Sequence, residues 1–363
     1  MKILEIIPQL SQGGAERFVV DLCNELSVRH NVTLVVLHNI DRTGFFLKEV
    51  STRVKVISMN KRKGLDLSLF FQLQSLIKKE NPDIVHTHLR AIVYSLLAYL
   101  IPSHTKYIHT VHSDAAKEAG DGISKLCRKF AFKTMRVTPV TISEESQKSF
   151  INFYGITPPM IYNGRPAYKG TEMYNKIRDE FSNLQSRRNS TIIVNVARVQ
   201  PEKNQLVLAK TIDDMNRQGK YIDLMIIGRY DDSPITPYLN NLNSKYLHLL
   251  GEKQNPRDYI KAADAFCLSS VFEGMPITLI ECFSVGTIPI CTPAGGIKNM
   301  IKDGENGILA TGFSQSDIRQ AIERFLLLSE SDKIIMRKNS QASFVKYTID
   351  TCARKYEKLM LSI

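Results

Sequence analysis

The sequence predicts an α/β protein made of two domains, each with a parallel sheet. Short apolar runs alternate with amphipathic helical patterns along most of the 363 residues, as they do where helices join parallel strands. The alternation pauses at the turn-forming segment 163–166, Asn-Gly-Arg-Pro, and restarts near residue 190. A chain of this length also exceeds one ordinary hydrophobic core, so two domains are expected.

Each half begins with an apolar strand and continues with the same rhythm. In the first half strands are expected at Lys2–Pro8, Val32–His38, Val54–Met59, Asp83–His88, Lys106–His112, Val137–Ile142 and Met160–Tyr162. In the second half they are expected at Thr191–Val196, Tyr221–Ile227, Leu247–Leu250, Ala263–Ser269 and Ile288–Cys291, with helix beyond Asp317. We therefore expect domains at residues 1–168 and 169–345, and a final helical segment, 346–363, that crosses back to the first domain.

Composition excludes several classes of protein. A hydrophobic content of 43% with 23% charged residues is typical of a globular protein. The longest apolar stretch, residues 92–102, is about half a membrane span, and the N-terminus lacks the apolar core of a signal peptide. The six cysteines include no C-x-x-C pair, which argues against a zinc site or a disulfide framework. We expect a cytoplasmic protein.

The net charge of +12 is concentrated in the first half. Residues 1–170 contain 23 Lys and Arg against 14 Asp and Glu, whereas residues 171–363 contain 25 against 22. This imbalance indicates an anionic partner for the first domain, with a solvated basic surface as the alternative. No basic–aromatic module for reading nucleic acid occurs, so no nucleic acid partner is expected.

One segment of the first half has the pattern of a basic amphipathic helix. Its cations recur at intervals of one to four residues with apolar residues between them: Lys125, Arg128, Lys129 and Lys133. Such a helix is typical of a protein that rests on an anionic membrane surface, here the inner face of the cell membrane. A solvated helix that packs its phenylalanines inward is the alternative.

Two groups of residues have the chemistry of a diphosphate site. Gly13 and Gly14 lie between the first strand and the first helix, where free backbone N–H groups and the helix dipole favour a phosphate. Arg198 and Lys203 follow the first strand of the second domain, and such cations neutralise charge on a leaving diphosphate. Either pair alone is weak evidence, because strand–helix turns often need glycine and basic pairs are often surface residues.

The sharpest feature is a pair of acids, Glu273 and Glu281, around a Gly-Met-Pro turn into a helix. The backbone N–H groups of Met275, Ile277 and Thr278 would face an anion there, whereas Pro276 has none. A carboxylate beside a sugar orients its hydroxyls and favours positive charge at the anomeric carbon. For Glu281 the alternative is an acid that interacts with the helix dipole.

Four histidines lie at two expected strand ends of the first domain, at positions 86, 88, 109 and 112. Strand ends are where catalytic groups are often found in such sheets, although a single histidine is more often structural. No group of ligand-type residues indicates a transition metal, and Asp-x-Asp is absent, so neither a metal nor another cofactor is expected.

Together these features resemble the retaining glycosyltransferases of family 4. Glu273 and Glu281 match the Glu–seven residues–Glu motif of that family, and Arg198 to Asn204 resembles its G-R-x-x-x-x-K-N segment with Ala197 in place of glycine. The turns at 295–297 and 303–307 and the opening loop at 13–16 match as well. The resemblance implies the GT-B fold, in which two Rossmann-like domains face a central cleft, with the acceptor on the first and the nucleotide sugar on the second.

The resemblance also implies roles for these residues. Arg198 and Lys203 would hold the diphosphate, Glu281 the ribose, and Glu273 the transferred sugar, whose departure it would assist. Gly14 would approach the diphosphate and His112 would lie beside the sugar. The reaction implied is metal-independent transfer of a hexose or N-acetylhexosamine, with retention, to a glycan or polyprenyl-diphosphate-linked acceptor.

The form Glu-Gly-Met-Pro at 273–276 favours a UDP-sugar donor and bacterial surface polysaccharide synthesis. Two departures from the family pattern affect the interdomain edge and the base site: Arg165-Pro166, and the Gly-Arg-Tyr turn at 228–230. Two alternatives remain open. One is a nucleotide-sugar 2-epimerase of the GT-B fold, which would act without an acceptor. The other is a catalytically silent GT-B subunit that binds a partner enzyme.

Overall fold

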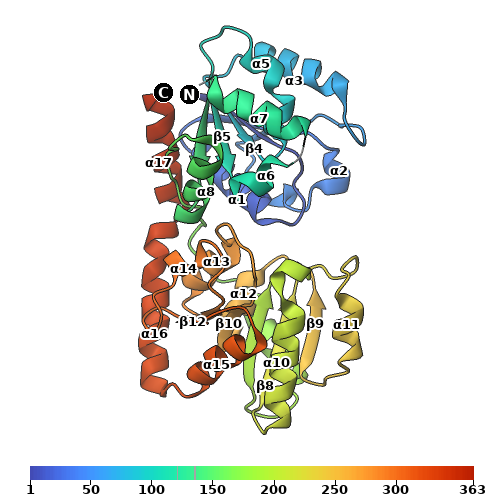
Figure 1. Cartoon of the computed structure of the whole chain (residues 1–363), viewed down its shortest axis with the longest axis vertical. Helices are drawn as coiled ribbons and strands as arrows, with labels where there is room; N and C mark the ends of the chain where they lie inside the picture. Colours follow the sequence, from blue (N-terminus) through green and yellow to red (C-terminus); the bar gives the residue numbers. More distant parts are fainter. Residues whose placement is uncertain (121, 135) are drawn as a thin grey trace. The chain divides into compact units, whose positions relative to one another are not determined.

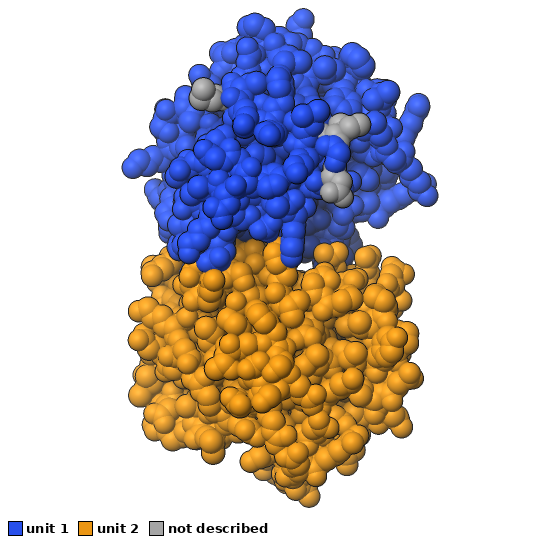
Figure 2. Space-filling view, in the orientation of Figure 1, with its two compact units in different colours: residues 1–166, 347–363 blue, residues 167–346 orange. Residues whose placement is uncertain are grey.

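The computed structural model describes residues 1–120, 122–134 and 136–363 and divides into two compact units (Figures 1 and 2). Unit 1 comprises residues 1–166 and 347–363, and unit 2 comprises residues 167–346. Each unit contains a six-stranded sheet, and the pairings between the described strands are all parallel. The predicted α/β class with two parallel sheets is confirmed.

The sheet of unit 1 has the strand order β3-β2-β1-β4-β5-β6. Its strands are β1 Lys2–Ile7, β2 Asn31–Val36, β3 Lys55–Ser58, β4 Ile84–His88, β5 Lys106–Val111 and β6 Val137–Thr141. Its helices are α1 Gly14–Leu26, α2 Ile40–Thr43, η1 Leu47–Glu49, α3 Leu67–Glu80, α4 Ala91–Tyr94, α5 Leu96–Tyr99, α6 Ala115–Ala119, α7 Ile123–Lys133, α8 Glu144–Tyr154 and the C-terminal α17 Ile349–Ser362.

The two faces of this sheet differ. Because side chains alternate along a strand, Leu4 and Ile6 of β1 point to the face where residues of α3, α4, α7 and α8 complete a large apolar core. Glu5 points to the opposite face. There α1 packs on β1 and β2, and α17 packs on α1. The C-terminal helix is therefore part of the unit that contains the N-terminal strand.

The sheet of unit 2 has the order β12-β11-β10-β7-β8-β9. Its strands are β7 Thr191–Val196, β8 Ile222–Ile227, β9 Leu247–Gly251, β10 Ala265–Leu268, β11 Ile288–Cys291 and β12 Ile308–Leu309. Its helices are α9 Tyr174–Leu184, η2 Pro201–Lys203, α10 Gln205–Arg217, α11 Thr236–Asn241, α12 Pro256–Ala262, α13 Ile277–Val285, α14 Ile297–Met300, α15 Gln315–Leu326 and α16 Glu330–Ser343, and η3 Phe344–Tyr347 lies at the boundary. Residues of α10, α11 and α15 form the apolar core with the sheet.

Both sheets have one point at which the strand order reverses. In unit 1, β1 lies between β2 and β4, and in unit 2, β7 lies between β8 and β10. Ligands of open parallel sheets bind beside the carboxyl ends of the strands at such a point. The loops that follow β1, β4, β7 and β10 are therefore where a site is expected in each unit.

Two sequence expectations differ from the structure. The strand expected at Met160–Tyr162 is wrong: only Met160 forms a bridge, to Thr141. Pro158 and Pro159 precede it and have no N–H for a ladder, so pairing cannot extend backwards. The two-residue strand β12 was not expected, because its apolar run is too short to stand out.

Among the described helices, none combines the length and the apolar character needed to cross a bilayer.

Candidate active site

The loops after β7 and β10 bring the predicted cations and acid of unit 2 together. Arg198 and Lys203 follow β7, Glu273 follows β10, and these two strands are neighbours at the reversal point. Lys203 Nζ donates to Glu273 Oε1 at 2.8 Å, and the two side chains are 20% and 9% exposed. The structure thus places a cation and a carboxylate in direct contact at the carboxyl ends of the central strands.

Glu273 has a second partner that the sequence did not reveal. Ser270 Oγ donates to the same carboxylate oxygen at 2.7 Å. Thr292 donates from its hydroxyl to the Ser270 carbonyl, which ties the loop to the end of β11. The sequence signal for Ser270 is only its position three residues before the acid. With two donors on one oxygen, the carboxylate is held in a single orientation.

Backbone contacts fix the position of Lys203. Ser269 Oγ donates to the Lys203 carbonyl at 2.8 Å, and the Val271 N–H donates to the Glu202 carbonyl at 2.9 Å. In the described part of the chain Arg198 is held through its backbone, since Gln205 Nε2 donates to its carbonyl at 2.9 Å. Its side chain is exposed and available for an anion.

The N-terminus of α13 lies beside the acid loop. Pro276 precedes the first helical residue, Ile277, and the N–H groups of Ile277 and Thr278 have no acceptor within the helix. Such groups and the helix dipole favour an anion. Met275 and Ile277 are buried, Thr278 is partly exposed, and Glu281 is only 2% exposed. Glu281, the residue expected to bind the ribose, is therefore a buried side chain in the middle of α13.

In unit 1 the glycine pair lies at the start of α1, as predicted. Gly13 is the N-cap and Gly14 is the first helical residue. A Cβ built on Gly13 would lie 2.2 Å from Oε2 of Glu16, so a larger residue there would displace the end of this acidic side chain. The N-terminus of this 13-residue helix offers the same donor groups as that of α13.

His112 follows β5 and is partly buried. Its backbone N–H donates to Glu118 Oε2 at 2.7 Å, and its ring packs edge-on against Phe18, with ring centroids 5.8 Å apart. Burial lowers its pKa to about 4, so the imidazole is neutral at neutral pH. His88 Nδ1 lies 3.0 Å from His112 Nε2.

The basic helix α7 needs one correction. Lys125, Lys129 and Lys133 are exposed, but Arg128 is 1% exposed and cannot belong to a membrane-facing surface. Arg128 donates to Glu118 at 3.1 Å and to the Leu89 carbonyl at 2.7 Å. A buried guanidinium needs such partners, and they are what hold it inside.

Comparisons with known proteins extend over both units. Residues 12–166 match the family model described as Glycosyltransferase Family 4, and residues 176–342 match the model described as Glycosyl transferases group 1. The two matches together take in most of the chain.

Two curated relatives are bacterial enzymes. One is the UDP-Gal:alpha-D-GlcNAc-diphosphoundecaprenol alpha-1,3-galactosyltransferase of Escherichia coli, 28% identical over 77% of this chain and 75% of its own length. Another is a Campylobacter jejuni alpha-1,4-N-acetyl-D-galactosaminyltransferase that acts on a GalNAc-GalNAc-diNAcBac-PP-undecaprenol, 26% identical over 85% of this chain and 84% of its own. Among solved structures, Anabaena HepE with UDP and glucose has a TM-score of 0.83 at 18% identity over the whole of both chains.

Proposed function

Because this chain belongs to the family 4 glycosyltransferases, which have the GT-B fold, and is therefore a sugar-transferring enzyme, we propose a specific reaction for it. It transfers a hexose or N-acetylhexosamine from a UDP-sugar to a polyprenyl-diphosphate-linked glycan, with retention, in bacterial surface polysaccharide synthesis. The contact of Lys203 and Ser270 with Glu273 at the end of the central strands carries the proposal.

The geometry of unit 2 suggests how its residues would act. Arg198 and Lys203 would neutralise the charge that grows on the departing diphosphate, together with the N–H groups at the start of α13. Glu273, held by two donors, would orient the sugar hydroxyls and favour the positive charge at the anomeric carbon. Glu281 would hold the ribose. The acceptor oxygen would attack on the face from which the diphosphate leaves, and a phosphate oxygen would take its proton.

The relatives support the donor, the acceptor class and the stereochemistry. The Escherichia coli enzyme is named for UDP-Gal and a diphosphoundecaprenol acceptor, and both bacterial enzymes are named for alpha linkages. UDP-galactose carries its sugar as the α anomer, so an α-linked product means net retention. Such an acceptor lies at a membrane, and the exposed lysines of α7 are a suitable surface for contact with it.

The test is release of nucleoside diphosphate from a panel of UDP-, GDP- and ADP-sugars in the presence of EDTA. We expect slow release from one UDP-sugar, and a loss of at least about 100-fold in Glu273→Gln, as when a transition-state contact is removed. The matched control is Glu330→Gln, an exposed acid of unit 2 that also pairs with a lysine, Lys333, at 2.8 Å. It should leave release unchanged.

The other outcomes distinguish the alternatives. Conversion of the donor to an epimerised sugar without any acceptor would identify an epimerase. No release and no thermal stabilisation by any nucleotide would identify a silent subunit. Loss of activity with EDTA that returns with a divalent cation would contradict the metal-independent reaction. With a lipid-linked acceptor, the proton coupling at the new anomeric carbon reports whether the linkage is α.

A further inference from the structure

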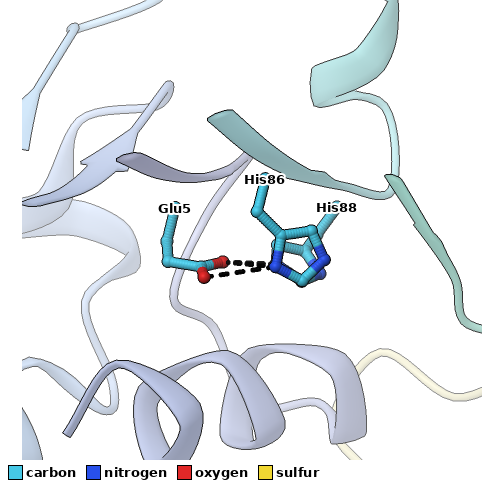
Figure 3. A group of neighbouring side chains, drawn as sticks. All are labelled: Glu5, His86 and His88. Carbon is cyan, nitrogen blue, oxygen red and sulfur yellow. Dashed lines mark hydrogen bonds and ion pairs between the residues drawn. The ribbon is translucent and has the colours of Figure 1, made fainter. Parts of the chain in front are cut away.

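A chain of buried polar side chains leads from the middle of the unit 1 sheet to His112. Glu5 of β1 points toward His86 and His88 of β4 (Figure 3), and all three residues are 0% exposed. Glu5 pairs in register with His86, and alternation along β4 brings His88 to the same face of the sheet. This is the face covered by α1 and α17. Three ionisable groups without contact to water must satisfy one another.

The contacts form a continuous path. Oε2 of Glu5 lies 2.9 Å from His88 Nε2 and 3.0 Å from His86 Nδ1. The opposite nitrogens are also engaged: His88 Nδ1 lies 3.0 Å from His112 Nε2, and His86 Nε2 lies 2.8 Å from Thr110 Oγ1. Every ring nitrogen of His86 and His88 therefore has a partner. The hydroxyl of Tyr356 on α17 ends the second branch, 2.8 Å from Thr110 Oγ1.

The charge state of the chain decides where each proton lies. Burial raises the pKa of Glu5, but the electrostatic interaction with His86 and the hydrogen bonds from His86 and His88 outweigh it and bring the value to about 2. An ionised carboxylate only accepts, so His88 Nε2 and His86 Nδ1 carry protons. Burial holds the pKa of His88 well below its usual range, so this ring is neutral and its Nδ1 has a lone pair. The proton between the two rings therefore belongs to His112 Nε2.

From this geometry we propose that Glu5 and His88 are positioning residues that hold His112 in the Nε2–H tautomer. Nδ1 of His112 is then an acceptor that binds a hydroxyl of the donor sugar. The Glu118 contact to the backbone N–H and the edge of Phe18 fix the residue from two further sides. The identity of the ligand, a hydroxyl of the donor sugar, rests on the proposed function. The tautomer of His112 does not depend on it.

The same three residues also have the composition of a metal site. One ligand atom from each of Glu5, His86 and His88 lies within 4.8 Å of the others. A metal ion would have to displace protons that now make hydrogen bonds on both histidines. The hydrogen-bonded chain accounts for all four ring nitrogens, and a metal site accounts for at most two of them, so the former is the better interpretation.

The test uses the full chain labelled with ¹⁵N in its histidine rings. In the wild-type protein we expect His112 to show a protonated Nε2 and an unprotonated Nδ1. Glu5→Gln places an amide N–H against a ring that previously donated. Where that ring is His88, its proton moves to Nδ1, and His112 must switch to the Nδ1–H tautomer. We then expect kcat/KM for donor hydrolysis to fall about 10-fold, the effect of losing one hydrogen bond, with little change in Tm.

Two further variants protect the test against simple misfolding. His88→Asn keeps an acceptor close to the position of Nδ1 and should retain the tautomer of His112 and activity within about threefold, whereas His88→Leu should lose both. The matched control is Glu357→Gln, because Glu357 also accepts from a histidine of unit 1, His30, at 2.9 Å, but lies outside the chain. It should change neither readout.

Several results would overturn the proposal. They are an Nδ1–H tautomer of His112 in the wild-type protein, an unchanged His112 tautomer in a Glu5→Gln protein whose His88 carries its proton on Nδ1, or one equivalent of a tightly bound metal whose removal shifts the His88 resonances. A reversed tautomer with unchanged donor hydrolysis would remove the sugar contact from His112. The spectroscopic result stands whether or not a nucleotide sugar is turned over, so failure of this proposal is distinguishable from failure of the proposed function.

Discussion

At the residue scale, a glycine from another loop determines where Glu273 lies. Gly295 has a φ of +49°, and a Cβ built on it would lie 1.8 Å from the carbonyl oxygen of Glu273. The Gly296 N–H donates to the Gly274 carbonyl at 3.1 Å, so the two loops are joined backbone to backbone. Gly304 also has a positive φ, +78°, but a Cβ there would meet nothing within 4 Å. An alanine at either position would therefore carry the free-energy cost of the left-handed conformation, but only an alanine at 295 would also clash with the Glu273 loop.

We expect Gly295→Ala to be much more harmful than Gly304→Ala. Both carry the left-handed conformation, which costs roughly 1–2 kcal/mol for alanine. Only the first also forces a methyl group into the Glu273 loop, and overpacking of this kind costs about 1–3 kcal/mol more. Donor hydrolysis should fall more than tenfold in Gly295→Ala and stay near wild type in Gly304→Ala. Chemical unfolding and nucleotide release measure the two effects, and equal losses would show that the contact does not position Glu273.

The residues that sequence could and could not predict differ in where their partners lie. Glu273 and Lys203 are marked by local motifs, and the structure places them together. Arg128 has the same local pattern as its neighbouring lysines, yet it is buried by partners 10 and 19 residues away, Glu118 and His109. Glu5 was not among the predicted site residues. Whether a charge is buried depends on tertiary partners, which local sequence does not show. For Glu5 the available signal was a single acid in an apolar strand, together with a His-x-His pattern in another strand.

At the scale of elements, strands were predicted better than surfaces. Strands β7 and β11 have the expected bounds, because an apolar run of β-branched residues is buried on both faces of a parallel sheet. Helix α7 was expected to be basic and amphipathic, and without Arg128 it presents three lysines around Leu126 and Phe130, which are 69% and 47% exposed. Exposed apolar side chains between cations are typical of a helix that lies in a membrane interface.

The prediction for α7 is loss of membrane binding on charge reversal. The triple variant Lys125→Glu, Lys129→Glu, Lys133→Glu should bind anionic vesicles at least about 100-fold more weakly, since each lysine near such a surface contributes about 1 kcal/mol. The control reverses three exposed lysines of unit 2, Lys210, Lys220 and Lys245. Vesicle sedimentation at low and high salt measures binding. Equal loss in both variants would mean that net charge, and not this helix, attracts the protein.

At the scale of the whole molecule, buried ionisable groups are distributed unevenly between the units. Unit 1 contains His109 and His112, whose pKa values burial lowers to about 4, and His88, whose pKa lies well below its usual range. It also contains Glu118, where the contacts with His109 and Arg128 outweigh burial and bring the pKa to about 2. Unit 2, by contrast, contains a single histidine, His248. Acid should therefore act first on unit 1.

The sign of this effect follows from proton binding. Between pH 6.5 and about 4 the unfolded chain protonates these histidines and the folded unit does not, so stability is lost as the pH falls through this range. Each of His109 and His112 contributes up to about 1.4 kcal/mol per pH unit.

Hydrogen exchange, corrected for its intrinsic pH dependence, should show the free energy of opening fall in unit 1 and stay nearly constant in unit 2. His109→Gln should reduce the slope in unit 1, whereas His104→Gln, at a histidine whose side chain is 53% exposed, should not. Parallel loss in both units would instead indicate that acid acts on the chain through its total charge.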